Sequence, residues 1–310
     1  MNAQRKGLGI ALILAMAACF SAADGIIKYL GAFLPVLLIL WLRYAFQAVV
    51  MAVWLVATGL AQFRSAHPKF QFARGALLLA TSALLFFGIQ HMPLAEFTAL
   101  GMLTPVVATL LAAWFLHERV SRLRWALVWG GFAGALVVIR PGSGVFGWAA
   151  ALPLLMALCY GSFHVLTSKL SALERPYTTH FYTGLWGTLL LAPVLFLGTT
   201  DLAGTVRAAP VWQLGLALAI GALNTTGHLL LIFAFRVART ATLMPFTYAQ
   251  IACAVLASWL VFRHVPDAWA WVGIGVITAC GAASAWLNVR AAADRAPPTA
   301  AALSGAPGDL

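Results

Sequence analysis

Long apolar runs recur about every 30 residues along this chain, and short polar or Pro/Gly-rich segments separate them. Each run can cross the roughly 30 Å hydrocarbon core of a bilayer, because an α-helix rises about 1.5 Å per residue. The chain is 63% hydrophobic and only 9% charged, which excludes an ordinary soluble enzyme, a disordered protein and a disulfide-stapled secreted domain. The predicted fold class is therefore an all-α polytopic membrane protein. Its ten predicted transmembrane helices are residues 8–30, 33–57, 72–90, 94–116, 122–140, 148–170, 178–198, 211–235, 240–262 and 267–289.

The basic residues set the predicted orientation, since Lys and Arg are retained on the cytoplasmic side of a membrane. Ten spans place both termini on one side, and Arg43 falls within a span. If the termini are cytoplasmic, the cytoplasmic basic residues are Arg5, Lys6, Arg64, Lys69, Arg74, Arg119, Arg122, Arg124, Lys169, Arg175, Arg236, Arg239, Arg290 and Arg295. The outer ones are only Lys28, Arg140, Arg207 and Arg263. This asymmetry predicts cytoplasmic termini in an inner (plasma) membrane, and it explains the net charge of +11 without a nucleic-acid partner.

The sequence carries no signature of a metal, a cofactor or an enzyme. The four cysteines lie inside apolar runs and lack metal-ligand spacing, so they are predicted to be small buried residues: Cys19, Cys159, Cys253 and Cys280. The motifs GxxxxGK[ST], GxSxG and HExxH are absent, which argues against an ATP-driven pump and against the hydrolases that those motifs define.

The two halves of the chain repeat with a shift of 140 to 145 residues. Residues 18–30 resemble residues 158–170, and residues 114–130 parallel residues 259–275. Each half holds five predicted spans, so the second half must cross in the opposite sense, which is the inverted repeat of many secondary transporters. One monomer then holds a complete repeat pair and is predicted to suffice for function. The predicted divisions are a cytoplasmic N-terminus (1–7), a first repeat (8–141), a second repeat (142–290) and a disordered cytoplasmic tail (291–310).

Three segments also carry a family resemblance. Residues 94–100, then Thr104-Pro105, then Phe115-Leu116-His117-Glu118-Arg119-Val120-Ser121 resemble the signature of the EamA-type drug/metabolite transporter superfamily. The resemblance implies ten helices, two EamA repeats, an inner-membrane location and transport of a small organic solute. The second repeat departs from the pattern, with Arg263-His264 in place of Glu118 and Gln250 in place of Pro105. The family includes amino-acid exporters and importers of riboflavin or S-adenosylmethionine, so the resemblance leaves the substrate open.

Ionisable side chains deep in a span are costly, so each is a candidate functional residue. Arg43 is the deepest, and Asp24 in the first span overlaps it in height. Two interpretations stand: a structural salt bridge between them, or an Arg43 fork that holds an anionic group of the substrate. Lys28, four residues after Asp24, is predicted to be a structural interface anchor.

A shift of 140 residues places Asp24 on His164 and Phe20 on Tyr160. Because the repeats are inverted, Asp24 and His164 should flank the midplane from opposite sides, and we expect them to be the proton-sensitive groups of two gates. A buried histidine with a structural hydrogen bond is the alternative for His164. The remaining predicted lining residues are polar or aromatic groups near the middle of their spans: Tyr160, Asn224, His228, Tyr248 and Gln250. Helix–helix hydrogen bonding is their alternative role.

Structural roles are predicted for Pro105, which should bend the fourth span, and for Glu118 and Arg119, which should form a clamp in the loop after it. The sequence thus predicts a secondary transporter that moves a small organic metabolite, such as an amino acid, a vitamin or a nucleoside-like solute, by alternating access, driven by protons or by the solute gradient. A flippase for lipid-linked head groups and a non-transporting membrane scaffold are the alternatives.

Overall fold

Helices make up nearly all of the described chain, and no strand occurs among the described residues. The computed structural model describes residues 3–59, 63–104, 106–107, 122–140, 146–171, 173–197, 202–237 and 244–294. The helices are α1 (Ala3–Leu30), α2 (Val36–Thr58), α3 (Pro68–His91), α4 (Leu94–Gly101), α6 (Arg122–Ile139), α7 (Ala151–Ser171), α8 (Pro176–Phe196), α9 (Leu202–Ala208), α10 (Val211–Val237), α12 (Ala249–Phe262) and α13 (Ala268–Asp294). Two 3₁₀ turns, η2 (Gly147–Ala150) and η3 (Met244–Tyr248), precede α7 and α12.

Within the described residues, five helical segments are long and apolar enough to cross a membrane: Gly7–Leu30, Val36–Thr58, Pro68–His91, Gly147–Thr167 and Val211–Leu231. Shorter apolar helices cover Trp125–Ile139, Phe246–Phe262 and Ala268–Ser284. The predicted all-α polytopic membrane fold is confirmed. The short helix α9 lies between α8 and α10 and was not predicted, because it is too short to register as an apolar span.

Prolines and a carboxylate set several helix starts. Pro68 and Pro176 occupy the first turns of α3 and α8, where the missing N–H of proline costs nothing. Asp267 precedes α13, and its Oδ1 accepts the Ala270 N–H at 2.8 Å. This bond, together with Arg140 Nη2 at 2.6 Å from Asp267 Oδ2, holds the pKa of the Asp267 carboxyl below its usual value.

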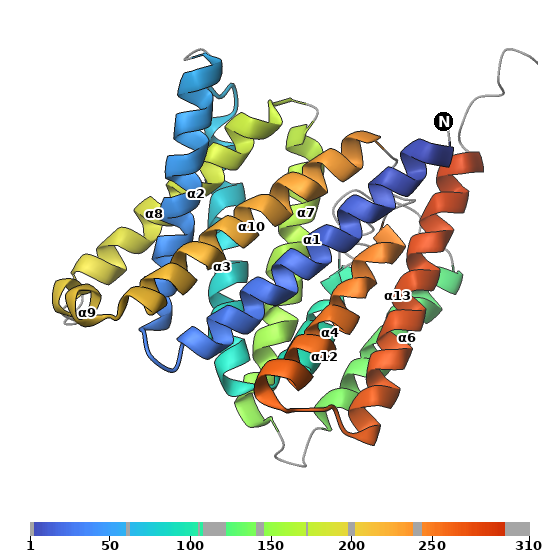
Figure 1. Ribbon diagram of the computed structural model, residues 1–310. Coiled ribbons are helices and arrows are strands. Elements are labelled where there is room, and N and C mark those ends of the chain that lie inside the picture. The colour runs from blue at the N-terminus through green and yellow to red at the C-terminus, as the bar shows by residue number, and fades with distance from the viewer. Residues whose placement is uncertain are drawn as a thin grey trace, which may run out of the picture.

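The first and last helices share one end of the bundle. In Figure 1, α1 begins and α13 ends at the same end of the bundle. Successive long helices run in alternating directions, so that the loop between α2 and α3 lies at this end and the loop between α12 and α13 lies at the opposite end. The start of α1 and the end of α13 therefore lie at one end of the bundle, as an even number of crossings requires.

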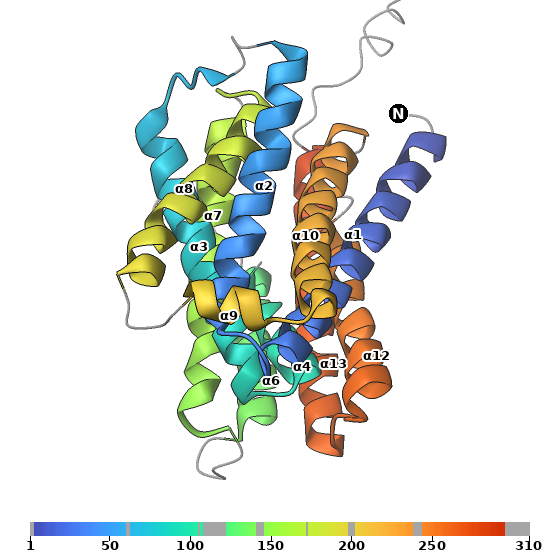
Figure 2. The same ribbon diagram turned by 60° about the vertical axis from the view of Figure 1, so that its left-hand side comes forward.

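The helix contacts follow an approximate two-fold relation between the halves. If α1, α2, α3, α4 and α6 correspond to α7, α8, α10, α12 and α13, the contact of α1 with α10 matches that of α7 with α3. The contacts of α2 with α8, α4 with α12 and α6 with α13 each map onto themselves. Figure 2 shows α2, α3, α7 and α8 on one side and α1, α10, α12 and α13 on the other. Each side therefore mixes helices from both halves of the sequence.

Two of the predicted spans, 94–116 and 240–262, depart from regular α-helix within their described residues. Helix α4 ends at Gly101, and residues 102–103 form a turn. In the ninth span, the described residues begin with the 3₁₀ turn η3, and α12 follows from Ala249. The two breaks meet, since the Tyr248 hydroxyl donates to the Met102 carbonyl at 3.4 Å. Breaks inside a membrane free backbone groups and occur where such groups meet protein or a cavity.

Candidate functional site

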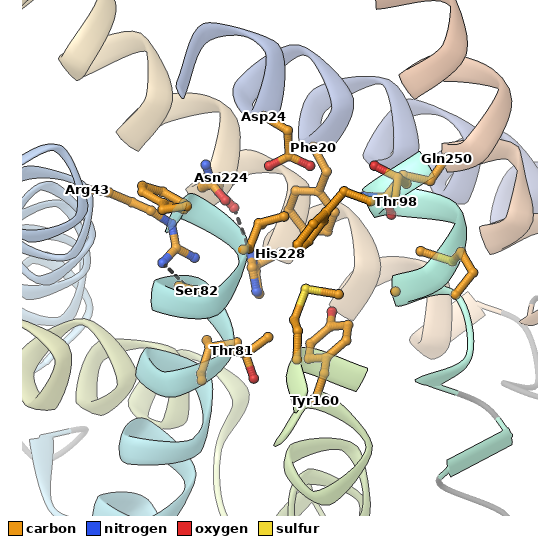
Figure 3. A pocket seen from close by; sticks show the side chains of 17 residues that line it. Phe20, Asp24, Arg43, Thr81, Ser82, Thr98, Tyr160, Asn224, His228 and Gln250 are labelled. Carbon is orange, nitrogen blue, oxygen red and sulfur yellow. Dashed lines mark hydrogen bonds between the residues drawn. The ribbon is translucent and has the colours of Figure 1, made fainter. Parts of the chain in front are cut away.

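A cavity of about 90 Å³ lies where the two halves of the chain meet. Its walls come from α1, α2, α3, α4, α7, α10 and α12, so both halves contribute. Figure 3 shows the polar side chains that point toward it. The complete lining is Phe20, Asp24, Arg43, Leu78, Thr81, Ser82, Leu85, Phe86, Phe97, Thr98, Gly101, Met102, Met156, Tyr160, Asn224, His228 and Gln250. Small-molecule sites usually enclose about 300–1,000 Å³, so an organic solute requires this cavity to widen.

Arg43 is buried in the cavity wall on α2, with 2% of its surface exposed. Its Nη1 donates to Ser82 Oγ on α3 at 3.0 Å, and its guanidinium lies 4.5 Å from the centre of the Tyr44 ring. The Tyr44 hydroxyl also forms a hydrogen bond with Ser82 Oγ, at 2.9 Å, so Ser82 holds both the arginine and the ring on which it lies. The buried Nε of Arg43 has no hydrogen-bond partner. The Nη1 group of the Arg43 guanidinium is therefore held by Ser82, whereas its Nε–H donor has no partner.

Asp24 lies on α1 at another part of the same wall and is 4% exposed. Among the described residues, Asp24 and Arg43 do not lie within ion-pair distance of each other. Overlap in height did not bring the two groups together, because their helices present them to the cavity from different directions, as Figure 3 shows. Asp24 also makes no hydrogen bond with any described residue.

Neutral polar groups of the second half complete the site. Asn224 and His228 lie one turn apart on α10, and the Asn224 carbonyl accepts a bond from His228 Nδ1 at 2.9 Å. The Phe20 ring packs edge-on against the His228 ring with centroids 4.9 Å apart. Gln250 lies in the first turn of α12, and its backbone carbonyl accepts a bond from Ser21 Oγ at 3.2 Å. The Asn224 and Gln250 amides and the aromatic rings thus line one cavity.

The structure places the remaining predicted residues as follows. Tyr160 lines the cavity from α7. Tyr248 does not line the cavity, because its hydroxyl points to the Met102 carbonyl. That hydroxyl fills the space beside Gly281, where an added Cβ would lie 1.7 Å from the Tyr248 hydroxyl oxygen. His164 belongs to α7, but its side chain lies outside the described part of the chain. Pro105, Glu118 and Arg119 also lie outside the described residues.

Several cavity residues escaped prediction. Thr81, Ser82 and Thr98 are hydroxyl residues within helices, and their small polar groups give no signal in an apolar sequence.

Arg74 was assigned to a cytoplasmic segment, but it lies inside α3 and is only 7% exposed. Its Nε donates to Thr167 Oγ1 at 2.9 Å, and its Nη1 bonds Thr183 Oγ1. This arginine joins α3 to α7 and α8, which are helices of the other half.

Polar contacts also join the halves at the end of the bundle where the loop between α12 and α13 lies. Glu96, in the first turn of α4, is 3% exposed and its Oε1 lies 2.9 Å from Nε2 of His264, which follows α12. Lys28, which the sequence predicts to be an interface anchor, donates from Nζ to the carbonyls of Ile89 and Met92, the latter at 2.9 Å. Lys28 therefore caps the end of α3.

A polytopic helical bundle with pseudo-two-fold contacts and a polar cavity between its halves has the form of a small-molecule transporter. The chain belongs to the EamA-like transporter family, whose model matches residues 7–140 and 147–284. The predicted membership of the drug/metabolite transporter superfamily, the ten-helix architecture with two repeats and the non-enzymatic class are confirmed.

The chain is similar to proteins with different named cargoes. It is 32% identical to a riboflavin transporter of Rhizobium johnstonii, over 76% of both chains. It is 29% identical to the pseudopaline exporter CntI of Pseudomonas aeruginosa, covering 89% of this chain and 95% of that protein. An S-adenosylmethionine uptake transporter of Rickettsia conorii is 25% identical, over 84% and 86% of the two chains. One solved crystal structure shares the fold, with a TM-score of 0.60, 18% identity and coverage of 94% of this chain and 99% of that one.

Proposed function

We propose that this protein moves a small polar organic metabolite across the bacterial inner membrane by alternating access, with cytoplasmic termini and a single copy as the working unit. The observation that carries the proposal is the cavity between the halves, which brings together six of the predicted residues: Asp24, Arg43, Tyr160, Asn224, His228 and Gln250. They come from distant parts of the sequence and from both halves. The named relatives support a small-molecule cargo, and riboflavin is the first solute to test.

The two helix breaks support an alternating-access cycle. Transporters with inverted repeats place their sites where discontinuous helices meet, and one half rocks against the other around the site. Here the break after α4 and the turn η3 lie against each other, and Gly101, Met102 and Gln250 beside them line the cavity. The cavity is smaller than a typical ligand pocket, which fits a conformation in which the two sides of the bundle have approached each other.

The proposed driving force is a proton gradient or the gradient of the solute. Asp24 and His164 are the proposed proton-sensitive groups, one in the cavity wall and one on α7. A protonophore is then expected to reduce uptake by the wild-type protein, and His164→Gln is expected to change its pH dependence. If neither treatment has an effect, proton coupling is discarded and the solute gradient remains as the driving force.

Uptake by the purified protein in proteoliposomes tests the proposal. The panel contains riboflavin, S-adenosylmethionine, amino acids, nucleosides and carboxylates, and protein-free liposomes give the background. We expect saturable uptake of at least one solute, and we expect Gln250→Ala to weaken it, because the amide lines the cavity. A panel in which no solute enters above background would contradict the proposed function.

A further inference from the structure

We infer that the cargo is amphoteric: Arg43 binds its carboxylate, and Asp24 binds its protonated amine across the same cavity. This inference rests on the proposed function and narrows it to a substrate class. The two groups are the charged residues of the cavity lining, and they have opposite signs. They face the cavity from two helices, α1 and α2, without forming an ion pair with each other (Figure 3).

Arg43 is arranged as half of an anion site. Its Nη1 is anchored on Ser82 at 3.0 Å and its planar face is held on Tyr44 at 4.5 Å, so its orientation is fixed before a ligand binds. Its Nε is buried without a partner, and no acidic side chain of the described residues lies within ion-pair distance. A guanidinium fork binds a carboxylate through paired N–H groups, which a neutral solute cannot match in charge.

Asp24 is arranged as the opposite half. It is 4% exposed, so the cavity is the space to which its carboxyl opens. Lys28, one turn away, does not neutralise it, because its Nζ is used by the carbonyls of Ile89 and Met92. A carboxylate in this position accepts bonds from an ammonium group, as it would accept a proton, so both proposed roles of Asp24 use the same chemistry.

Leaving both charges unmatched is costly. A buried charge without an ion-pair partner recovers only part of the hydration that it loses, whereas a cargo with both charges would pair with Arg43 and Asp24 together. The wall between them is aromatic and amide-lined, with Phe20, His228 and Asn224 beside the two charges. A ring or amide in the cargo would lie there, while its two charged groups fix its direction.

Four nucleosides with the same adenosine group separate the two charges. S-adenosylhomocysteine carries a carboxylate and an amine, 5′-(3-carboxypropylthio)adenosine only the carboxylate, 5′-(3-aminopropylthio)adenosine only the amine, and 5′-methylthioadenosine neither. Binding to the detergent-purified protein is measured by titration calorimetry, with riboflavin as an uncharged comparison. We expect S-adenosylhomocysteine to bind at least about tenfold more tightly than each of the others, since each charge-assisted contact contributes separately.

Each variant should erase one half of that preference. In Asp24→Asn, the carboxylate-only nucleoside is expected to bind as well as S-adenosylhomocysteine; in Arg43→Gln, the amine-only nucleoside should do so. Arg140→Gln is the matched control, because Arg140 pairs with Asp267 outside the cavity. This variant should keep the wild-type preference among the four nucleosides. Ligand-free melting temperatures show whether each variant folds, and Arg43→Lys and Asp24→Glu replace any that does not.

Three results would overturn the inference: no binding of S-adenosylhomocysteine, equal binding of the four nucleosides, or a preference that survives in both variants. Tight binding and transport of riboflavin that ignores Asp24→Asn and Arg43→Gln would also overturn it, yet the proposed transport function would stand. A protein that transports no solute of the uptake panel would instead contradict the proposed function itself.

Discussion

Cross-linking position 96 to position 264 is expected to stop transport almost completely. Glu96 and His264 lie 2.9 Å apart and belong to opposite halves of the chain, so a covalent link between them ties the halves at one end of the bundle. If the halves must separate there once in each cycle, uptake should fall at least about tenfold, as expected when a required conformational step is blocked. Riboflavin, or whichever solute the uptake panel identifies, serves as the reporter.

The experiment uses Glu96→Cys with His264→Cys in a protein whose four native cysteines are replaced by alanine, linked by a short bis-methanethiosulfonate reagent. The unlinked double variant gives the baseline, and the two single-cysteine variants show the effect of modification alone. Reduction of the linker should restore uptake. A linked protein that transports at the baseline rate would show that this end of the bundle need not open.

A single methyl group at Gly273 is expected to destabilise the protein strongly. Helices α6 and α13 approach so closely there that a Cβ at Gly273 would lie 2.6 Å from the Gly134 carbonyl oxygen and 2.5 Å from Val138 Cγ2. Backbone cannot move aside as a flexible side chain does, so Gly273→Ala should lower the free energy of unfolding by about 1–3 kcal/mol, the usual cost of overpacking. The melting temperature in detergent measures the effect.

Gly275 is the matched control on the same helix. A Cβ there would meet nothing within 4 Å, so Gly275→Ala should leave the melting temperature unchanged or raise it, because alanine favours a helix over glycine. Equal melting temperatures for Gly273→Ala and Gly275→Ala would contradict the close crossing of α6 and α13.

The sequence predicted the helices well because each span must satisfy its own backbone in lipid. Spans such as 122–140 and 211–235 differ from α6 (Arg122–Ile139) and α10 (Val211–Val237) by at most two residues at either end. The prolines inside the fourth and ninth spans predict a bend in each, but they do not locate the turn at residues 102–103 or the 3₁₀ geometry of η3. Apolar composition marks membrane depth, whereas a break depends on what the neighbouring helices offer to the freed carbonyls.

Depth in the span was also the useful signal for the site. It singled out Arg43, Asn224 and Gln250, because a polar group near the midplane has few inexpensive positions. It could not place Tyr248, which lies close to Gln250 in sequence but precedes the start of α12 and points elsewhere. Nor could it detect the contact of Arg43 with Ser82, which joins residues 39 positions apart on separate helices.

Arg74 also shows that position in a span does not predict the contacts of a side chain. A basic residue near the start of a span resembles one that reaches the interface, yet this one is buried among threonines of α7 and α8. Which neighbours receive such a side chain depends on the helix arrangement. The inverted repeat indicates that the halves meet, but it does not determine which faces they present to each other.

Protection of position 250 by the cargo tests the central claim most directly, namely that the cavity between the halves holds the solute during transport. In a background without the native cysteines, Gln250→Cys is modified with a small charged methanethiosulfonate reagent, and the modification rate is measured with and without the transported solute. Because Gln250 lines the cavity, saturating solute should slow the modification severalfold, and modification should block uptake. A modified protein that still transports, at a rate that the solute does not protect, would place the transport site elsewhere.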